Sequence, residues 1–211
     1  RDTDPAAIVA AVLGHDTGSS GVGVADMTAA AAAAVGPLLW RKLAAANARV
    51  GALFRRLAAD AGSPATAAAY DAAIDACAAA PVVSWAAVAA AHADNAVVSV
   101  LVDTAAALAT ARGLMRAMGE AAGVPIEPPE QAALADATLA VPGVLAAGVP
   151  GAGGFDALFA LVLTTADGAP LAGVERVWLA WPGGGVTPLP LTNGAGAGEP
   201  GAGVLVTASS L

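Results

Sequence analysis

Apolar residues recur along the first two thirds of the chain with the spacing of one helix face. From Leu39 to Leu57 they fall at alternating steps of four and three residues, which predicts an amphipathic helix. Pro37 suits the first turn of this helix, so we expect a separate helix before it, over the alanine run that ends at Val35. Gly62-Ser63-Pro64 predicts where the second helix ends.

The helical period continues from Ser84 to about Ala122, with polar residues at His92–Asn95 that can interrupt it. Gly123 is placed to end this long helix. One shorter helix is expected before it, and another, opened by Pro128-Pro129, after it.

The pattern then changes to short apolar runs. Gly143–Ala147 and Ala157–Thr164 have strand length and flank a glycine-rich segment, which predicts strand, loop and strand. Pro170–Trp181 predicts a helix, and Val186–Leu191, with two prolines, predicts an edge strand. Gly203–Thr207 is expected to form a final edge strand or a frayed tail.

This order of elements predicts an α+β fold with a small antiparallel or mixed sheet and helices on one of its faces. Near the start, Ile8–Leu13 predicts a buried strand. We therefore expect residues 1–24 to be a strand and loop left from a preceding domain, and residues 25–211 to form the main domain. Its helical part would span 25–142 and its sheet region 143–211.

The composition of the chain limits the kinds of partner and environment that suit it. The chain has 211 residues, 57% of them hydrophobic, 12% charged, and a net charge of −8. Nucleic acid is an unsuitable partner for so acidic a chain. Prolines and glycines interrupt the longest uncharged stretches, so no window is expected to span a membrane. The single cysteine, Cys77, lies among alanines and is expected to be a buried core residue.

The loop between the two strands carries the strongest chemical signal. Gly151-Ala152-Gly153-Gly154 lacks most of the Cβ atoms that would keep a backbone away from a ligand, and successive N–H groups in such a turn can bind an anion. Asp156 adds a carboxylate that could orient a hydroxyl, a lysine or Mg²⁺. A tight hairpin without a ligand explains the same spacing, which fits neither a dinucleotide-binding motif nor a P-loop.

Two runs of residues resemble one known family. Gly148–Ala157 is similar to the third, C-terminal glycine motif of the GHMP kinases, in the form found in the eukaryotic phosphomevalonate kinase family. The resemblance continues upstream in Leu114–Pro128, where Met, Gly and Pro positions match. It covers nearly all of the chain, most strongly from Gly113 to Leu163.

The resemblance implies the site residues. The Gly151–Gly154 loop would lie at the wall shared by the nucleotide phosphates and the acceptor, and Asp156 would orient the loop or a cationic partner. Thr17-Gly18-Ser19-Ser20 resemble a family segment that faces the acceptor, although Gly21–Val24 depart from the family pattern. The long helix and the Pro125–Pro128 turn would pack behind the loop, and we expect three charged helix residues to support it from there: Arg112, Arg116 and Glu120.

The resemblance also implies the reaction. With ATP and Mg²⁺, the family transfers the γ-phosphoryl group to 5-phosphomevalonate in isoprenoid and sterol biosynthesis. The first two family motifs, including the main ATP loop, are missing, so we expect the N-terminal half of the kinase upstream and no activity from these residues alone. No metal site is expected among the residues of this chain. The expected compartment is the cytosol, and the family resemblance makes the peroxisome the alternative.

Two alternatives stay open. One is another GHMP kinase, such as a mevalonate or homoserine kinase, although the Gly154-Phe155-Asp156-Ala157 ending argues against it. The other is an alanine-rich binding domain with a glycine hairpin and no nucleotide affinity. The sequence upstream of Arg1 would distinguish a kinase from a binding domain, because a kinase needs a glycine- and serine-rich nucleotide loop there.

Overall fold

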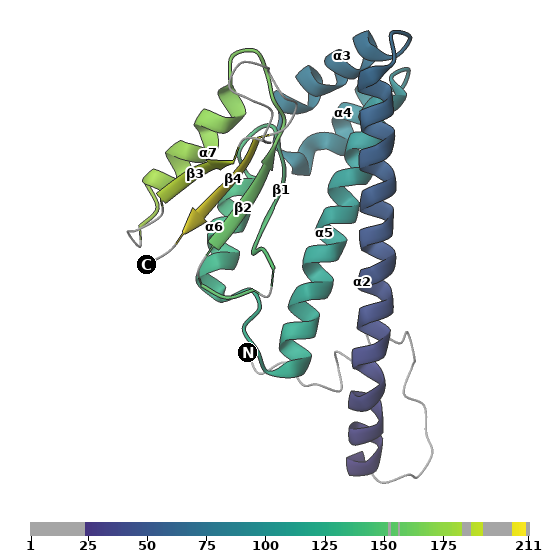
Figure 1. The fold of residues 1–211 in the computed structure, drawn as a ribbon, viewed down its shortest axis with the longest axis vertical. Helices are drawn as coiled ribbons and strands as arrows, with labels where there is room; N and C mark the ends of the chain where they lie inside the picture. The colour runs from purple at the N-terminus through teal and green to yellow at the C-terminus, as the bar shows by residue number, and fades with distance from the viewer. Residues whose placement is uncertain (1–23, 152, 156, 183–186, 192–203, 210–211) are drawn as a thin grey trace.

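The computed structural model describes residues 24–151, 153–155, 157–182, 187–191 and 204–209. Figure 1 shows two parts side by side, a group of helices led by two long ones and a twisted sheet with shorter helices. The described elements are helical as far as Leu139, and the strands begin at Val144. The prediction of an α+β fold is therefore confirmed. The predicted strand and loop before Val24 lie outside the described residues.

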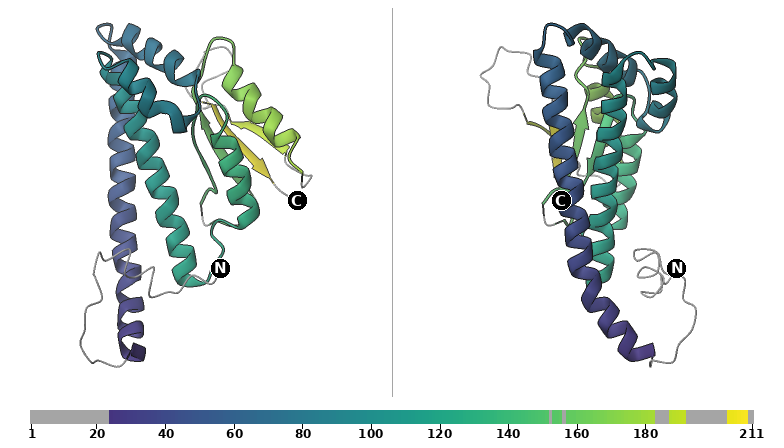
Figure 2. Two further views of the ribbon diagram at one scale, coloured as in Figure 1. Left: turned by 180° about the vertical axis from the view of Figure 1, so that it is seen from behind. Right: turned by 90° about the vertical axis from the view of Figure 1, so that its right-hand side faces the viewer.

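The two longest helices pack against each other along much of their length (Figures 1 and 2). They are α2 (Val24–Gly62) and α5 (Ala96–Ala122). The apolar stripe predicted for α2 forms part of this contact, and Leu39, Leu43 and Leu57 are buried. Packing of such stripes supplies most of the stability of helices in proteins.

The prediction of two helices on either side of Pro37 is wrong. α2 is continuous, and Pro37 lies inside it. Proline removes one backbone donor and crowds the preceding turn. The alanine- and leucine-rich residues on both sides favour the helix strongly enough for it to continue through this defect.

Shorter elements connect the long helices: α3 (Ala67–Ala78), a 3₁₀ turn η1 (Val82–Ser84) and α4 (Trp85–Ala91). The break expected at His92–Asn95 is present. Asn95 caps α5, because its side-chain oxygen accepts a hydrogen bond from the Val97 N–H at 3.0 Å. Gly123 ends α5 in the left-handed conformation, at φ 63°.

One helix departs from the expectation about membranes. Among the described residues, α5 is long and apolar enough to cross a membrane by length and composition. The bent pair formed by α3 with the η1–α4 segment passes the same test only if it counts as one broken span. Core helices of soluble proteins also meet this criterion, and α5 contacts α2, α3, α4 and β1.

In the described part of the chain, the sheet has four antiparallel strands in the order β1-β2-β4-β3. They are β1 (Val144–Gly148), β2 (Ala157–Val162), β3 (Thr187–Leu191) and β4 (Val204–Ser209). β3 is an edge strand, as its two prolines predicted. The prediction of an edge position for the last strand is wrong, because β4 lies between β2 and β3. Unlike β3, it has no proline and can donate from every residue.

Both faces of the sheet contact helices. α6 (Pro129–Leu139) and α7 (Ala169–Leu179) cover one face, where alternate residues of β2 are buried: Leu158, Ala160 and Val162. On the other face, Leu145 and Leu163 join the core beneath α5, together with Cys77, Trp85 and Leu101. The prediction that Cys77 is a buried core residue is confirmed.

Candidate functional site

The glycine loop connects the end of β1 to the start of β2. Gly151, Gly153 and Gly154 all have positive φ angles, of 63°, 85° and 116°. L-residues with side chains rarely adopt this backbone conformation. At Gly153 there is also no space, because a Cβ atom would lie 2.3 Å from the carbonyl oxygen of Ile126. Only glycine fits at 153 without moving the neighbouring turn.

Three hydrogen bonds among the described residues fix the loop. The Gly153 N–H donates to the Pro150 carbonyl at 3.2 Å, and the Gly154 N–H donates to the Ile126 carbonyl at 3.0 Å. The buried Gln131 side chain donates to the Phe155 carbonyl at 2.7 Å. Loop and turn therefore pack together, as the family resemblance implied.

These hydrogen bonds limit the predicted anion nest. The N–H groups of Gly153 and Gly154 already have protein acceptors. A phosphate group would have to use other amides of the loop, or it would have to displace one of these acceptors. Phosphate binding at residues 151–154 stays a prediction.

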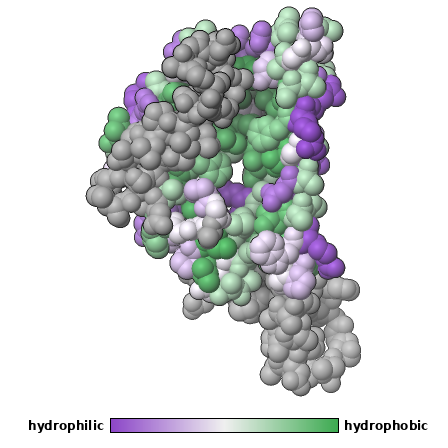
Figure 3. All heavy atoms as spheres, viewed as in Figure 1, coloured by the Kyte–Doolittle hydropathy of each residue, from purple (hydrophilic) through white to green (hydrophobic). Residues whose placement is uncertain are grey.

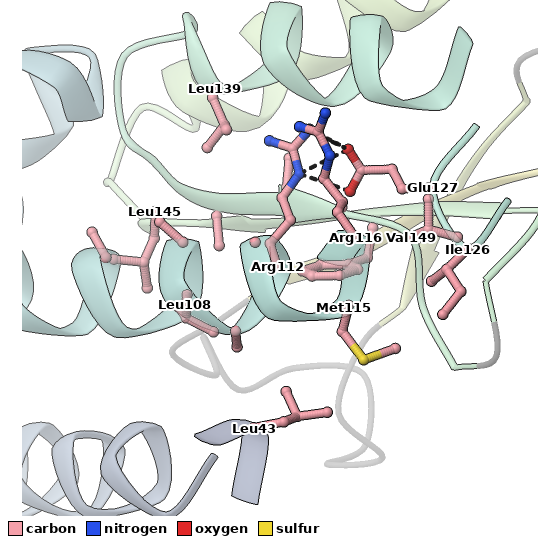
Figure 4. Close-up of a pocket in the computed structure, with 18 of the residues that line it drawn as sticks. Leu43, Leu108, Arg112, Met115, Arg116, Ile126, Glu127, Leu139, Leu145 and Val149 are labelled. Atoms are coloured by element: carbon pink, nitrogen blue, oxygen red, sulfur yellow. Dashed lines mark hydrogen bonds and ion pairs between the residues drawn. The ribbon is translucent and has the colours of Figure 1, made fainter. Parts of the chain in front are cut away.

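A group of charged side chains lies next to the turn. The Arg112 Nε donates to both Glu127 carboxylate oxygens, at 3.1 and 2.9 Å, and its Nη2 donates to Oε1 at 2.6 Å. The Arg112 Nη1 pairs with Asp136 Oδ1 at 2.8 Å. Figure 4 shows the guanidinium groups of Arg112 and Arg116 pointing toward the Glu127 carboxylate. The Arg116 Nη1 lies 4.0 Å from it, at the limit of an ion pair.

Burial and charge act in opposite directions on Arg112. Desolvation lowers its pKa, but the hydrogen bonds and charges of Glu127 and Asp136 outweigh this effect, and the pKa is raised overall. Arg112 therefore stays a cation throughout the physiological pH range. The Glu127 side chain is only 4% exposed. Such a buried carboxylate is costly unless a cation and hydrogen bonds compensate it, and Arg112 supplies both.

A cavity of about 410 Å³ lies between α2, α5 and β1. Its walls are mainly apolar, with contributions from Leu43, Leu108 and Phe159, and the charged group of Arg112, Arg116 and Glu127 borders it. Figure 3 shows hydrophobic side chains around a hollow between the long helices and the sheet. A cavity with apolar walls and a few charged groups at one side is a common form of small-molecule site.

Comparison with known proteins agrees with this arrangement. Residues 104–182 match the family described as GHMP kinases C terminal. This segment is similar to the C-terminal domains of GHMP kinases. The chain is also similar to the peroxisomal phosphomevalonate kinase of Arabidopsis thaliana, with 54% identity over 70 residues. That match covers 33% of the chain and 14% of the relative. No solved structure matches the chain.

The predicted site residues fall into three groups. Gly151, Gly153 and Gly154 lie in the loop, which rests on the turn that Arg112 and Arg116 flank. Glu120 is exposed and takes no part in the Arg112–Glu127 network. The remaining candidates lie outside the described residues: Thr17, Gly18, Ser19, Ser20, Ala152 and Asp156.

Three residues of this site were not selected from the sequence: Glu127, Gln131 and Asp136. Glu127 stands within the run that carries the family resemblance, between Ile126 and Pro128. A lone carboxylate in an otherwise apolar turn was the available signal. Its partner, 15 residues earlier, follows no helical or strand spacing.

The described residues contain no group of three or more His, Cys, Asp or Glu side chains that could hold a metal ion. Mg²⁺ in phosphoryl-transfer sites is commonly bound by one or two carboxylates together with the substrate phosphates. Asp156, the candidate orienting carboxylate of the loop, lies outside the described residues, and the use of Mg²⁺ in the reaction stays a prediction.

Proposed function

We propose that this chain is the C-terminal part of a phosphomevalonate kinase, which transfers the γ-phosphoryl group of ATP to 5-phosphomevalonate. The observation that carries the proposal is the glycine loop packed on the Pro125–Pro128 turn, in a segment that matches the GHMP kinase C-terminal family. The 54% identity to a protein named phosphomevalonate kinase supports the choice of acceptor.

The proposed reaction needs positioning more than covalent help. A phosphate oxygen of the acceptor forms a bond to the γ-phosphorus of ATP, and the bond from this phosphorus to the β,γ-bridging oxygen breaks, releasing ADP. Catalysis then consists of alignment and stabilisation of the charge on the transferred group. When bound, Mg²⁺ would neutralise part of this charge, and Asp156 is the residue we propose to orient the loop or a cationic partner.

The glycine loop would form the wall beside the phosphates. Residues 1–24, including Thr17–Ser20, would belong to the N-terminal half, which would supply the main ATP loop and contacts to the acceptor. Arg116, half exposed at the border of the cavity, adds a positive charge near this wall. An acidic chain could thus bind polyanions through a few local donors.

The test is an ADP-release assay on the full-length protein that contains these residues, with ATP, Mg²⁺ and either 5-phosphomevalonate or mevalonate. We expect turnover with 5-phosphomevalonate only. Turnover with mevalonate instead would identify another GHMP kinase. No turnover with either acceptor from folded protein would reject the kinase proposal and favour a binding domain.

A pair of matched variants tests the loop. Gly153→Ala and Gly151→Ala both place a side chain at positive φ, but only residue 153 has a neighbour within contact distance. We expect kcat/KM to fall by roughly 100-fold for Gly153→Ala, because a displacement of about 1 Å can cost that much. The fall for Gly151→Ala should stay below about 10-fold. Equal losses would show that the contact with Ile126 is irrelevant.

The compartment is a separate part of the proposal. The Arabidopsis relative is named as peroxisomal. We propose the cytosol for this protein, with the peroxisome as the alternative. Imaging the full-length protein beside a peroxisomal marker decides between them.

A further inference from the structure

One guanidinium group connects three segments of the site. Arg112 lies on α5, its Nε and Nη2 bind Glu127 in the turn after α5, and its Nη1 binds Asp136 on α6. Its Nη2 also lies 3.4 Å from the Ala132 carbonyl of α6. A planar guanidinium with five donors can make such contacts in fixed directions, whereas a lysine cannot.

The glycine loop is attached to two of these same segments. Gly154 donates to Ile126, the residue before Glu127, and Gln131 on α6 binds the Phe155 carbonyl. The Arg112 side chain therefore binds both segments that hold the loop, the turn that contains Ile126 and helix α6. Figure 4 shows Glu127 and Ile126 on one stretch of backbone, with the two arginines reaching it from α5.

The turn also packs closely on α5. The Val124 N–H donates to the Gly119 carbonyl at 2.9 Å, and a Cβ atom at Gly119 would lie 2.6 Å from the Val124 carbonyl oxygen. This contact leaves little room for the turn to shift along the helix. The position of Ile126 is thus determined by α5 on one side and by the Glu127 ion pair on the other.

Burial separates this ion pair from an ordinary surface pair. The side chains of Arg112 and Glu127 are 16% and 4% exposed, whereas those of the Arg49–Asp103 pair are 60% and 56% exposed. Exposed pairs contribute little to structure. In some proteins, a buried charged pair instead fixes one arrangement of the segments that carry it.

We propose that Arg112 and Glu127 are positioning residues for the glycine loop, and that they act through the Ile126 carbonyl, which binds Gly154 and borders Gly153. The kinetic part of this inference rests on the proposed kinase function. The structural part, that the buried ion pair holds the loop, is independent of it.

The experiment measures hydrogen–deuterium exchange and kinetics on the full-length protein. Exchange is followed in the peptide that covers 149–158 and, as a reference, in α3 (67–78). The single variants are Glu127→Gln and Arg112→Lys. Arg112→Met/Glu127→Met removes both charges, so that no unpaired buried charge remains if a single variant folds poorly. Asp103→Asn, which breaks the exposed pair, is the matched control.

We expect loop exchange to increase at least 10-fold in both single variants, with exchange in α3 unchanged. The double variant should recover thermal stability toward that of the wild type but keep the fast loop exchange. With 5-phosphomevalonate, kcat should fall roughly 10- to 100-fold while KM for ATP changes less than about 3-fold, because alignment is lost more than binding. Asp103→Asn should match the wild type in every measurement.

Unchanged loop exchange in Glu127→Gln would overturn the proposal. A parallel increase in the loop and in α3 would also overturn it, because the pair would then serve overall stability alone. Faster loop exchange with unchanged kcat in an active enzyme would overturn the catalytic part. If the wild type lacks kinase activity, the proposed function fails, and the exchange data still decide whether the pair holds the loop.

Discussion

At the residue scale, two buried tryptophans combine apolar packing with a satisfied N–H group. The Trp85 indole donates to the carbonyls of Cys77 and Ala80, at 2.9 and 3.0 Å. The Trp178 indole donates to the Thr138 hydroxyl at 2.8 Å, between the two helices that cover the sheet. Each N–H would be costly to bury without an acceptor, so each bond fixes how its neighbours pack.

Removing the Trp178 bond should destabilise the domain. Trp178→Phe deletes the indole donor and leaves a void beside Thr138, whose own hydroxyl still donates to the Leu134 carbonyl. We expect the free energy of unfolding to fall by about 2 kcal/mol. Urea unfolding of the variant measures this loss.

Trp40→Phe is the control, because Trp40 is 62% exposed. Its unfolding free energy should stay within about 0.5 kcal/mol of the wild type. Equal effects of the two substitutions would contradict a specific role for the Trp178–Thr138 bond.

Single residues were predicted where local sequence determines their environment. Cys77, surrounded by alanines, was correctly expected in the core, and Gly123 was correctly expected to end a helix. Glu127 and Gln131 were missed because their importance depends on partners 15 and 24 residues away. Neither the hydrophobic pattern nor helix propensity predicts contacts between residues so far apart in the sequence, because these contacts form only when α5, the turn and α6 pack together.

At the scale of elements, the start of α5 depends on Asn95. Its side-chain oxygen caps the helix, and its Nδ2 donates to the Ala69 carbonyl of α3 at 2.8 Å. Asn95→Ala loses both contacts, and we expect the free energy of unfolding to fall by roughly 1–2 kcal/mol. Thermal unfolding followed by circular dichroism checks this value.

Asn47→Ala is the matched control, because Asn47 is exposed in the interior of α2. Alanine is the stronger helix former, so this variant should be as stable as the wild type or slightly more stable. A loss equal to that of Asn95→Ala would show that the cap has no specific role.

Most helices and strands were predicted from periodicity, because their apolar faces match the contacts they make. The two wrong predictions, a helix boundary at Pro37 and an edge position for the last strand, both depend on neighbouring residues or strands. Pro37 predicted a boundary, but strong helix formers on both sides outweighed it. The last strand was expected at an edge, but a strand's neighbours depend on long-range pairing that its own residues do not specify.

At the scale of the whole molecule, the buried thiol of Cys77 makes the stability of the fold depend on pH. It lies in the core that joins α2, α3 and α5 to the sheet, and burial raises its pKa from 9.0 to about 11. Below pH 9 the thiol is protonated in both the folded and the unfolded chain. Between pH 9 and 11 only the unfolded chain releases its proton, so stability should fall as the pH rises, by up to about 1.4 kcal/mol per pH unit.

Urea unfolding at pH 8.0, 9.5 and 10.5 tests this dependence beside Cys77→Ala, which lacks the thiol. The pKa of Tyr70 is also raised, by burial and by Asp71, but Tyr70 is present in both proteins and its effect cancels in the comparison. Identical pH profiles for the two proteins would contradict the prediction.

The strand order has a consequence for synthesis on the ribosome. β3 pairs with β4 and lies at the edge, while β4 also completes the hydrogen bonds of β2. When the nascent chain has emerged from the ribosome as far as Leu191, β3 has no neighbouring strand. The apolar strand β2 then has unpaired backbone groups along the edge that β4 will occupy. Such edges attract strands from other chains. The sheet closes only when Val204–Ser209 leaves the exit tunnel, so this interval is when a chaperone would be most useful.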